Sequence, residues 1–331
     1  RVSVPDKAAL DDVKRIAPDV CIATPVNMRY SSADLEYLKA AISLGVPTAI
    51  PVYSWDNLTT KGVFQVLPDR VLVWNRAQIA EAVEHQDVSP ERMRIVGAPQ
   101  FDVWFSGECT PTPRAIFLQR SGLESARPFV VYLGSSRHIA KDETWFLRRF
   151  WGVLRAAADE RLRTMQVIVR PHPANAEIYG GMQLEGVVVY PPGGSLPDTA
   201  EALQVFTDTL HHAVAAVGIN NSAMIEAIIA DKPVVSPLLD RYVTTQKKAE
   251  HFRLLAENQA LEIVRSDEDM CRVLAALLDG RDGRRELRRR FIEKFIRPYG
   301  IGVSAGERVV AELEELVGQK SRLSHDNQRR V

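Results

Sequence analysis

The chain has 331 residues, of which 46% are hydrophobic, and its 42 basic side chains balance 42 acidic ones. This length is enough for two domains of about 150 residues each. The balanced charge supplies no positive field of the kind that nucleic-acid binding uses, so no nucleic-acid partner is expected.

Three widely spaced cysteines, Cys21, Cys109 and Cys271, predict neither a zinc site nor a disulfide framework and indicate a reducing compartment. No apolar run approaches the roughly 20 residues that span a bilayer, and no secretory leader opens the sequence. Together these features predict a cytoplasmic protein.

Strand-like and helical stretches alternate along the first third of the chain. Strands are predicted at 20–23, 47–52, 70–74 and 94–96, and helices at 32–44 and 76–85. Such alternation predicts a parallel sheet with crossover helices, and therefore a Rossmann-like domain over residues 1–113. Because the chain begins with Arg1 and only one helical stretch precedes the first strand, we expect this domain to be truncated at its amino end.

A loop dense in polar and aromatic residues, Tyr53 to Gly62, follows the predicted strand at 47–52. In such a loop Trp55 could stack on a sugar and Asp56 could act as a general base toward an acceptor. A turn formed by Asp56 and Asn57, with Trp55 in the core, explains the same residues equally well. Both interpretations stay open at the level of sequence.

A linker is predicted from Gly107 to Arg114, and a second alternating series begins after it. The second domain is predicted to cover residues 114–318, and residues 319–331 are expected to form a disordered tail. The fold class is thus α/β, with two Rossmann-like domains whose parallel sheets face each other across a cleft. The predicted strands of this domain are 129–133, 167–169, 187–190, 213–217, 234–237 and 261–264, and the predicted carboxyl-terminal helices are 267–278, 284–296 and 305–317.

The predicted helix at 284–296 is basic and amphipathic, with Leu287, Phe291 and Phe295 forming an apolar stripe. Such a helix can lie on an anionic membrane, which predicts peripheral contact with the inner face of the membrane. The alternative, which we favour, is a helix that packs its stripe on the fold and leaves its arginines in water.

The segment 167–175 is the most informative feature of the sequence. Its β-branched run leads directly into Arg170-Pro171-His172-Pro173, which predicts a buried strand that ends in a rigid loop. Open α/β sheets bind ligands at this edge, and arginine and histidine are suitable donors to phosphate. The alternative is that the prolines only end the strand and that His172 caps a backbone group.

Two further strand ends in the same domain carry polar groups. Ser135 and Ser136 follow the strand at 129–133, where amides and hydroxyls can hold an anion, and His138 lies just beyond them. Asn221 and Ser222 open a predicted helix at 223–230, whose free amides also suit a phosphate. Glu226 lies one turn later and could accept hydrogen bonds from ribose hydroxyls. Capping without any ligand is the alternative for both helix starts.

Several motifs are absent from the sequence. It contains no Walker motif, no Gly-x-Gly-x-x-Gly, no Gly-x-Ser-x-Gly and no Asp-x-Asp pair. Hydride transfer, classical ATP hydrolysis and serine hydrolysis therefore lose support, and neither a metal site nor a cofactor is expected.

With these residues identified, the second domain resembles the donor-binding half of two-Rossmann (GT-B) transferases. It is most similar to the CDP-glycerol glycerophosphotransferase and capsule polysaccharide group, which carries a His-Pro motif. The similarity covers about residues 129–238, and it implies that His172 and Ser222 hold the nucleotide phosphates of a donor. Where glycerophosphotransferases carry Asp-Tyr-Ser-Ser, this chain has Ile219-Asn220-Asn221-Ser222.

The sequence as a whole predicts metal-independent transfer of a sugar or polyol phosphate from a nucleotide-activated donor to a glycan or lipid-linked acceptor. In this scheme Arg170, His172 and Ser222 stabilise the departing nucleotide phosphate, because the transition state must accommodate its charge. The other residues assigned to the site are Ser135, Ser136 and Asn221 as further groups at the phosphates, Glu226 at the ribose, and Asp56 as base, with His138 as the next candidate. A sugar-nucleotide epimerase of the same architecture and a non-catalytic nucleotide-sugar-binding partner are the alternatives.

Overall fold

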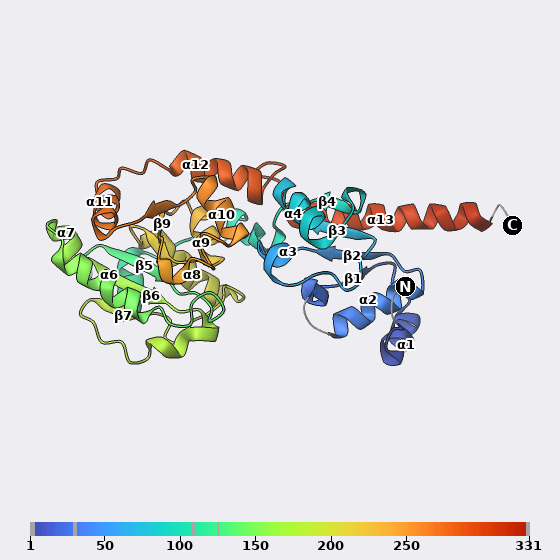
Figure 1. Cartoon of the computed structure of the whole chain (residues 1–331), viewed down its shortest axis with the longest axis horizontal. Helices are drawn as coiled ribbons and strands as arrows, with labels where there is room; N and C mark the ends of the chain where they lie inside the picture. Colours follow the sequence, from blue (N-terminus) through green and yellow to red (C-terminus); the bar gives the residue numbers. More distant parts are fainter. Residues whose placement is uncertain (1–3, 29–31, 108–109, 125, 329–331) are drawn as a thin grey trace. The chain divides into compact units, whose positions relative to one another are not determined.

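The computed structural model describes residues 4–28, 32–107, 110–124 and 126–328, and for residues 26, 27 and 321–328 it describes the backbone alone. The chain divides into two compact units (Figure 1). Unit 1 comprises Arg1–Phe105 and Ile292–Val331, and unit 2 comprises Ser106–Phe291. Cys109 and part of the predicted linker lie outside the described residues.

Unit 1 contains a four-stranded parallel sheet in the order β1-β2-β3-β4. Its predicted strands are confirmed to within a few residues. In chain order its elements are α1 (Lys7–Ile16), β1 (Cys21–Ile22), a 3-10 turn (Pro25–Met28), α2 (Ala33–Ser43), β2 (Thr48–Pro51), α3 (Asn57–Thr60), β3 (Arg70–Val73), α4 (Arg76–Gln86), a 3-10 turn (Pro90–Arg92), β4 (Met93–Ile95), a 3-10 segment (Pro99–Phe105), a π-helical turn (Ile292–Ile296) and α13 (Ala305–Gln328).

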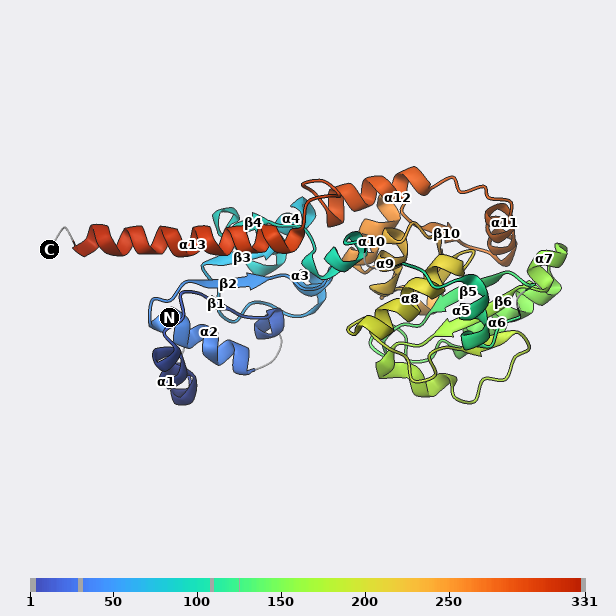
Figure 2. The same cartoon turned by 180° about the vertical axis from the view of Figure 1, so that it is seen from behind.

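The carboxyl-terminal helix α13 groups with unit 1, whereas the sequence predicted that it belongs to the second domain. It runs alongside the sheet of unit 1 in Figure 2. The guanidinium group of Arg70, which is 3% exposed in β3, forms an ion pair with Glu312 of α13 at 2.6 Å. Asp102 accepts hydrogen bonds from Ser304 and from the amide of Gly306 at the start of the helix. These long-range contacts leave no local pattern in the sequence.

Helix α13 continues to Gln328 and so covers most of the stretch 319–331 that was expected to be a disordered tail. Near its end, Gln319 accepts a hydrogen bond from Arg70, and Lys320 forms an ion pair with Asp69 at 2.9 Å. Polar composition alone predicted disorder, but these side-chain contacts hold this part of the helix against unit 1. Residues 329–331 lie outside the described residues.

Unit 2 contains a six-stranded, fully parallel sheet in the order β10-β9-β8-β5-β6-β7. Every strand predicted for the second domain is present, although β8 begins three residues later than expected. The elements are α5 (Arg114–Ser121), β5 (Phe129–Leu133), α6 (Thr144–Ala156), α7 (Glu160–Arg163), β6 (Gln166–Arg170), the 3-10 segment η4 (Pro173–Tyr179), β7 (Val187–Val189), α8 (Ala200–His212), β8 (Ala216–Gly218), α9 (Ala223–Ile229), β9 (Val234–Pro237), the 3-10 turn η5 (Asp240–Tyr242), α10 (Glu250–Glu257), β10 (Glu262–Val264), α11 (Asp267–Leu278) and α12 (Arg285–Phe291).

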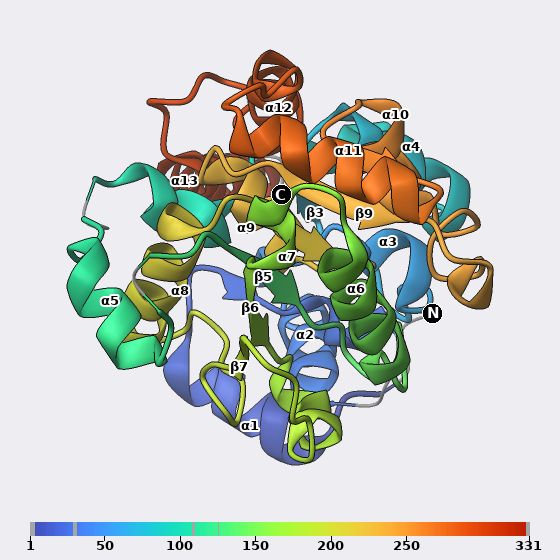
Figure 3. The same cartoon turned by 90° about the vertical axis from the view of Figure 1, so that its left-hand side faces the viewer.

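Helices cover both faces of this sheet (Figure 3). On one face, alternate residues of β5 and β6, such as Val130 and Val167, pack with α6 and α11. On the other face, Phe129 of β5 packs against Phe117 of α5. Because both faces are covered, polar groups of this sheet can reach a ligand only at its edges, and the loops at the carboxyl edge carry the predicted site.

The basic helix packs as an ordinary part of the fold. Phe291 and Phe295 of its predicted stripe are 1% and 5% exposed. Its arginines pair with carboxylates, among them Arg288 with Asp231 and Asp282, and Arg289 and Arg290 with Glu286. These contacts do not test the predicted membrane contact, which stays a prediction. Within the part of the chain that the structure describes, no helix is both long and apolar enough to cross a membrane.

Candidate functional site in unit 2

Three polar strand ends meet at the carboxyl edge of the unit 2 sheet. Strands β8, β5 and β6 are neighbours, and Leu133 at the end of β5 pairs with both Gly218 and Arg170. The segments that the sequence singled out, 134–136, 170–175 and 218–222, therefore emerge side by side. Strand order is a tertiary property, so this convergence could only be hypothesised from the sequence.

Side-chain amides tie the three loops together. Asn175, which is 2% exposed, donates to the carbonyl oxygens of Ala140 at 3.0 Å and Ser135 at 3.3 Å. Asn221 donates to the carbonyl oxygen of Leu133 at 2.8 Å. Because amides bridge between backbone groups in this way, the loops form one connected surface that is organised before any ligand binds.

His172 caps the segment η4 that follows it. Its Nδ1 accepts a hydrogen bond from the amide of Ala174 at 3.1 Å. A backbone amide can only donate, so the ring proton of the neutral imidazole lies on Nε2. Burial, together with the nearby ring of His138, lowers the pKa of His172 below its usual value. At neutral pH His172 therefore offers an uncharged Nε2–H donor.

Arg170 does not lie in the open as a phosphate ligand. Its side chain is 4% exposed, and its guanidinium group stacks over the ring of Phe206 at 4.2 Å. Nη2 donates to the backbone oxygen of Ser195 at 2.8 Å and to the hydroxyl of Ser195 at 3.1 Å. Burial lowers the pKa of Arg170 to about 10, against the opposing effect of Glu226. Arg170 is thus held by contacts within unit 2, and its role as a phosphate ligand stays a prediction.

The loop after β7 lies directly on the His-Pro segment. Gly194 has a φ of +67°, and a Cβ at this position would lie 2.5 Å from the carbonyl oxygen of Pro171. Only glycine fits such an approach. Through Ser195 the same loop receives the hydrogen bonds of Arg170, so the two loops hold each other in place.

At the start of α9 the two predicted caps have different roles. The Oδ1 of Asn221 accepts from the amide of Met224 at 3.1 Å and so caps the helix. The hydroxyl of Ser222 makes no capping hydrogen bond, and the residue is exposed. Glu226 is 8% exposed and lies within electrostatic reach of Arg170. Ser222 is therefore the group at this strand end that remains accessible to a ligand.

Ser135 and Ser136 also differ in their accessibility. The side chain of Ser135 is fully buried, and its amide donates to Oε2 of Glu143 at 2.8 Å. The structure therefore does not present Ser135 to a ligand, contrary to its predicted role as a donor. Ser136 is partly exposed and His138 is exposed, so these two residues of the loop, unlike Ser135, lie at the surface.

Glu143 was not predicted from the sequence. It precedes α6, is 0% exposed, and also accepts a hydrogen bond from the hydroxyl of Tyr179 at 2.9 Å. Burial raises the pKa of Glu143. No pattern marks it, because a glutamate next to a helix start is ordinarily a surface residue favoured by the helix dipole.

Asp56, in the loop of unit 1 that was predicted to bind an acceptor, is held by contacts within that loop. The carboxylate of Asp56 accepts from Ser54 at 2.6 Å and from Thr60 at 2.9 Å, and it pairs with Lys61 at 3.2 Å. Trp55 is 3% exposed and belongs to the core, so it provides no open stacking face. Burial thus favours the alternative interpretation for Trp55, whereas the role of Asp56 as a base stays a prediction.

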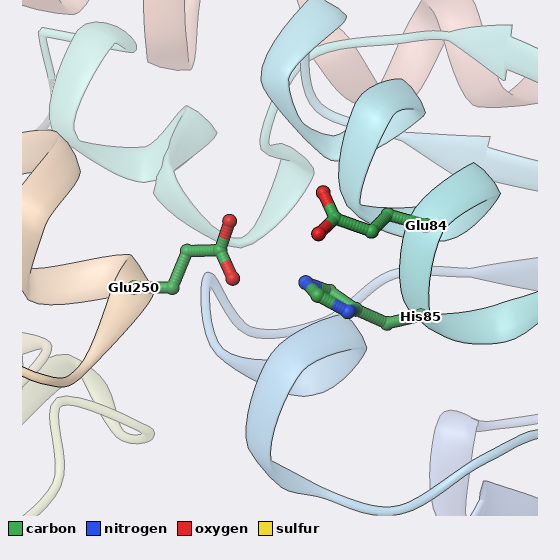
Figure 4. A group of neighbouring side chains, drawn as sticks. All are labelled: Glu84, His85 and Glu250. Atoms are coloured by element: carbon green, nitrogen blue, oxygen red, sulfur yellow. The ribbon is translucent and has the colours of Figure 1, made fainter.

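A group of possible metal ligands, Glu84, His85 and Glu250, is drawn in Figure 4. Glu84 and His85 are consecutive residues of α4 in unit 1, whereas Glu250 begins α10 of unit 2. Because the three belong to separate units, we infer no metal site from them.

No protein-family model and no curated protein sequence matches the chain. Solved structures do match. A UDP-GlcNAc 2-epimerase from Methanocaldococcus jannaschii, in complex with UDP-GlcNAc and UDP, has a TM-score of 0.57 at 12% identity, covering 93% of this chain and 79% of that chain. The H548A variant of the wall teichoic acid polymerase TagF has a TM-score of 0.55 at 11% identity, covering 91% and 74%.

A third match is WaaG, a glycosyltransferase involved in lipopolysaccharide biosynthesis, with a TM-score of 0.50 at 14% identity, covering 92% of this chain and 80% of that chain. At these identities the similarity is one of fold. The chain has the GT-B type of architecture, with two Rossmann-like units that each contain a parallel sheet, as the sequence predicted.

Proposed function

We propose that this protein is a transferase that moves a sugar or polyol phosphate from a nucleotide-activated donor to a glycan or lipid-linked acceptor. The observation that carries the proposal is the convergence of three polar loops on the neighbouring strands β8, β5 and β6. The resemblance of residues 129–238 to the CDP-glycerol glycerophosphotransferase group, and the fold shared with a glycosyltransferase and a wall teichoic acid polymerase, support it. No metal or cofactor is required by this scheme.

The donor phosphates are assigned to the accessible groups at the carboxyl edge of unit 2. Nε2–H of His172 and the hydroxyls of Ser136 and Ser222 donate hydrogen bonds to the phosphate oxygens. As the bond to the transferred group breaks, negative charge grows on the departing nucleotide phosphate, and fixed donors stabilise it. Arg170 supports this surface from below by holding Ser195, and its charge lies within reach of Glu226.

The acceptor requires a base that removes the proton of its hydroxyl group. Asp56 is our first candidate, because Ser54, Thr60 and Lys61 hold its carboxylate in one orientation. His138 is the next candidate. Glu226 is assigned to the ribose hydroxyls of the donor, since a carboxylate is a strong acceptor.

A sugar-nucleotide epimerase is the second candidate function. The match to a UDP-GlcNAc 2-epimerase over 93% of this chain favours it, because this fold accommodates both chemistries. An epimerase converts one nucleotide sugar into another and needs no acceptor, which separates the two proposals by their products.

The test is product analysis with a panel of UDP, CDP, GDP and CMP conjugates. A transferase releases free nucleotide only when an acceptor is present, whereas an epimerase interconverts nucleotide sugars without one. A protein that binds a nucleotide sugar but forms neither product is a binding partner and contradicts both proposals. Turnover should also survive excess chelator, and activity that is lost there and restored by magnesium would overturn metal independence.

A further inference from the structure

A buried carboxyl group joins the two loops that flank the proposed phosphate site. Oε2 of Glu143 accepts from the amide of Ser135 at 2.8 Å and from the hydroxyl of Tyr179 at 2.9 Å. Ser135 lies in the loop after β5, and Tyr179 ends the segment after β6 that begins beside His172. Together with Asn175, this side chain links the loops that carry Ser136 and His172.

No cation compensates this carboxyl group among the residues that the structure describes. The titratable side chains that face it are Tyr132 of β5, Tyr179 of η4 and, further away, Tyr242 of η5. Asp142 precedes it in the chain and has its own partner in Thr144. The hydroxyls of Tyr132 and Ser135 lie near the carboxyl group without forming an aligned hydrogen bond to it.

A buried carboxylate without a cation is costly in its charged form, and burial raises the pKa of Glu143 accordingly. A phosphate bound at the adjacent loops would add negative charge to the same region. Two like charges close together in a poorly solvated place disfavour the ionised carboxylate further. Protonation of the carboxyl group removes the repulsion, with water supplying the proton.

We propose that Glu143 is a positioning residue of the phosphate site, which fixes the spacing of its two loops and takes up a proton when a nucleotide diphosphate binds beside it. This inference rests on the proposed function, because it requires a nucleotide at these loops. Proton uptake follows from linkage: a ligand that raises a group's pKa binds more tightly at low pH.

The experiment is isothermal titration of the whole protein with UDP-GlcNAc at pH 6, 7 and 8. UDP-GlcNAc is chosen because both of its phosphates are esterified and keep a constant charge over this range. At each pH the titration is repeated in two buffers that differ in ionisation enthalpy, which measures the protons taken up. Glu143→Gln keeps an oxygen that can accept from both Ser135 and Tyr179 but cannot titrate. Glu201→Gln, which removes an exposed carboxylate of α8 outside the two loops, is the matched control.

The wild-type protein and Glu201→Gln should take up more protons than Glu143→Gln, and their affinity should fall with pH by up to about tenfold per unit where one proton is taken up. Any uptake by His172 is common to all three proteins and cancels in the comparison. Equal proton uptake and parallel pH dependence in wild type and Glu143→Gln would overturn this proposal for Glu143 and leave the proposed function standing. Failure of the wild-type protein to bind any nucleotide of the panel would instead overturn the proposed function, and with it the proposed proton uptake by Glu143.

Tyr179→Phe provides a second variant in case Glu143→Gln does not fold. It removes a donor to the ionised carboxylate, so the pKa of Glu143 should rise and the pH dependence of UDP-GlcNAc binding should move to higher pH. An unchanged midpoint in Tyr179→Phe contradicts the proposal. Without ligand, the free energy of unfolding of the wild-type protein should fall relative to that of Glu143→Gln as pH rises through the raised pKa, because there the folded state binds more protons than the unfolded state.

Discussion

The side-chain amide of Asn221 donates a hydrogen bond to the carbonyl oxygen of Leu133 at 2.8 Å, while its Oδ1 caps α9 through the amide of Met224. A single side chain therefore joins the start of the helix after β8 to the end of β5. This bridge keeps Ser222 beside the loop that carries Ser136.

Replacing Asn221 by alanine should lower the free energy of unfolding by about 1–3 kcal/mol, since it removes a helix cap and leaves the carbonyl oxygen of Leu133 without this partner. Urea unfolding monitored by circular dichroism measures the change. Asn258→Ala is the control, because its amide bonds only to Leu254 of its own helix at the surface. Equal losses in the two variants would mean that the bridge adds no stability of its own.

For His172, two substitutions separate capping from ligand binding. Asparagine can place its oxygen near the position of Nδ1 and retain the bond to Ala174, but it loses Nε2–H. His172→Asn should therefore keep the stability of η4 and weaken nucleotide binding by about 1.5–3 kcal/mol, the usual scale of a hydrogen bond to a charged group. Isothermal titration with the tightest-binding nucleotide measures this, and His211→Ala on the exposed end of α8 is the control. Wild-type affinity in His172→Asn would remove His172 from the site.

The lowered pKa of His172 also predicts how stability depends on pH. Between the lowered value and 6.5, the folded state binds fewer protons than the unfolded state. The contribution of His172 is therefore fully present above pH 6.5 and is lost as pH falls through its folded-state pKa. Thermal unfolding of wild type and His172→Asn from pH 5 to 8 should show a steeper rise with pH for the wild type. Parallel curves would contradict the assignment.

Glu226→Gln should weaken the binding of ribonucleotides more than that of their 2′-deoxy counterparts, because a carboxylate accepts from ribose hydroxyls better than an amide does. Paired titrations with a ribonucleotide and its deoxy form measure the difference. Glu201→Gln, at an exposed position of α8, is the matched control. Equal weakening for both sugars would mean that Glu226 acts through Arg170 rather than at the ribose.

Asp56→Asn tests the proposed base. If Asp56 removes the proton of the acceptor, the variant should fold and bind the donor as the wild type does, while turnover falls by about 10²- to 10⁴-fold. Steady-state rates with the donor and acceptor found in the product analysis supply the measurement. Turnover within threefold of wild type would leave Asp56 as a residue that only organises the turn with Ser54 and Thr60, and His138→Ala would then be the next variant to measure.

Local patterns in the sequence were sufficient to predict most of the secondary structure. Strands β5 and β9 and helix α11 have the predicted bounds, because their apolar periodicity and the prolines or caps at their ends act within a few residues. The same patterns located the three polar strand ends. What they could not provide was the order β8-β5-β6, which depends on pairing between segments more than 80 residues apart, as for Leu133 and Gly218.

By itself, the sequence determined the α/β class, the two Rossmann-like units and the identity of the polar loops, since each follows from spacing and residue type along a short stretch. Only the tertiary structure decided which of those polar groups are buried and which are exposed. Arg170 and Ser135 are buried by Phe206, Ser195 and Glu143, none of which is their neighbour in the chain. The grouping of α13 with unit 1 was likewise decided by the buried ion pair of Arg70 and Glu312, 242 residues apart. Burial and charge pairing depend on contacts between residues that are far apart in the sequence, so local periodicity cannot predict them.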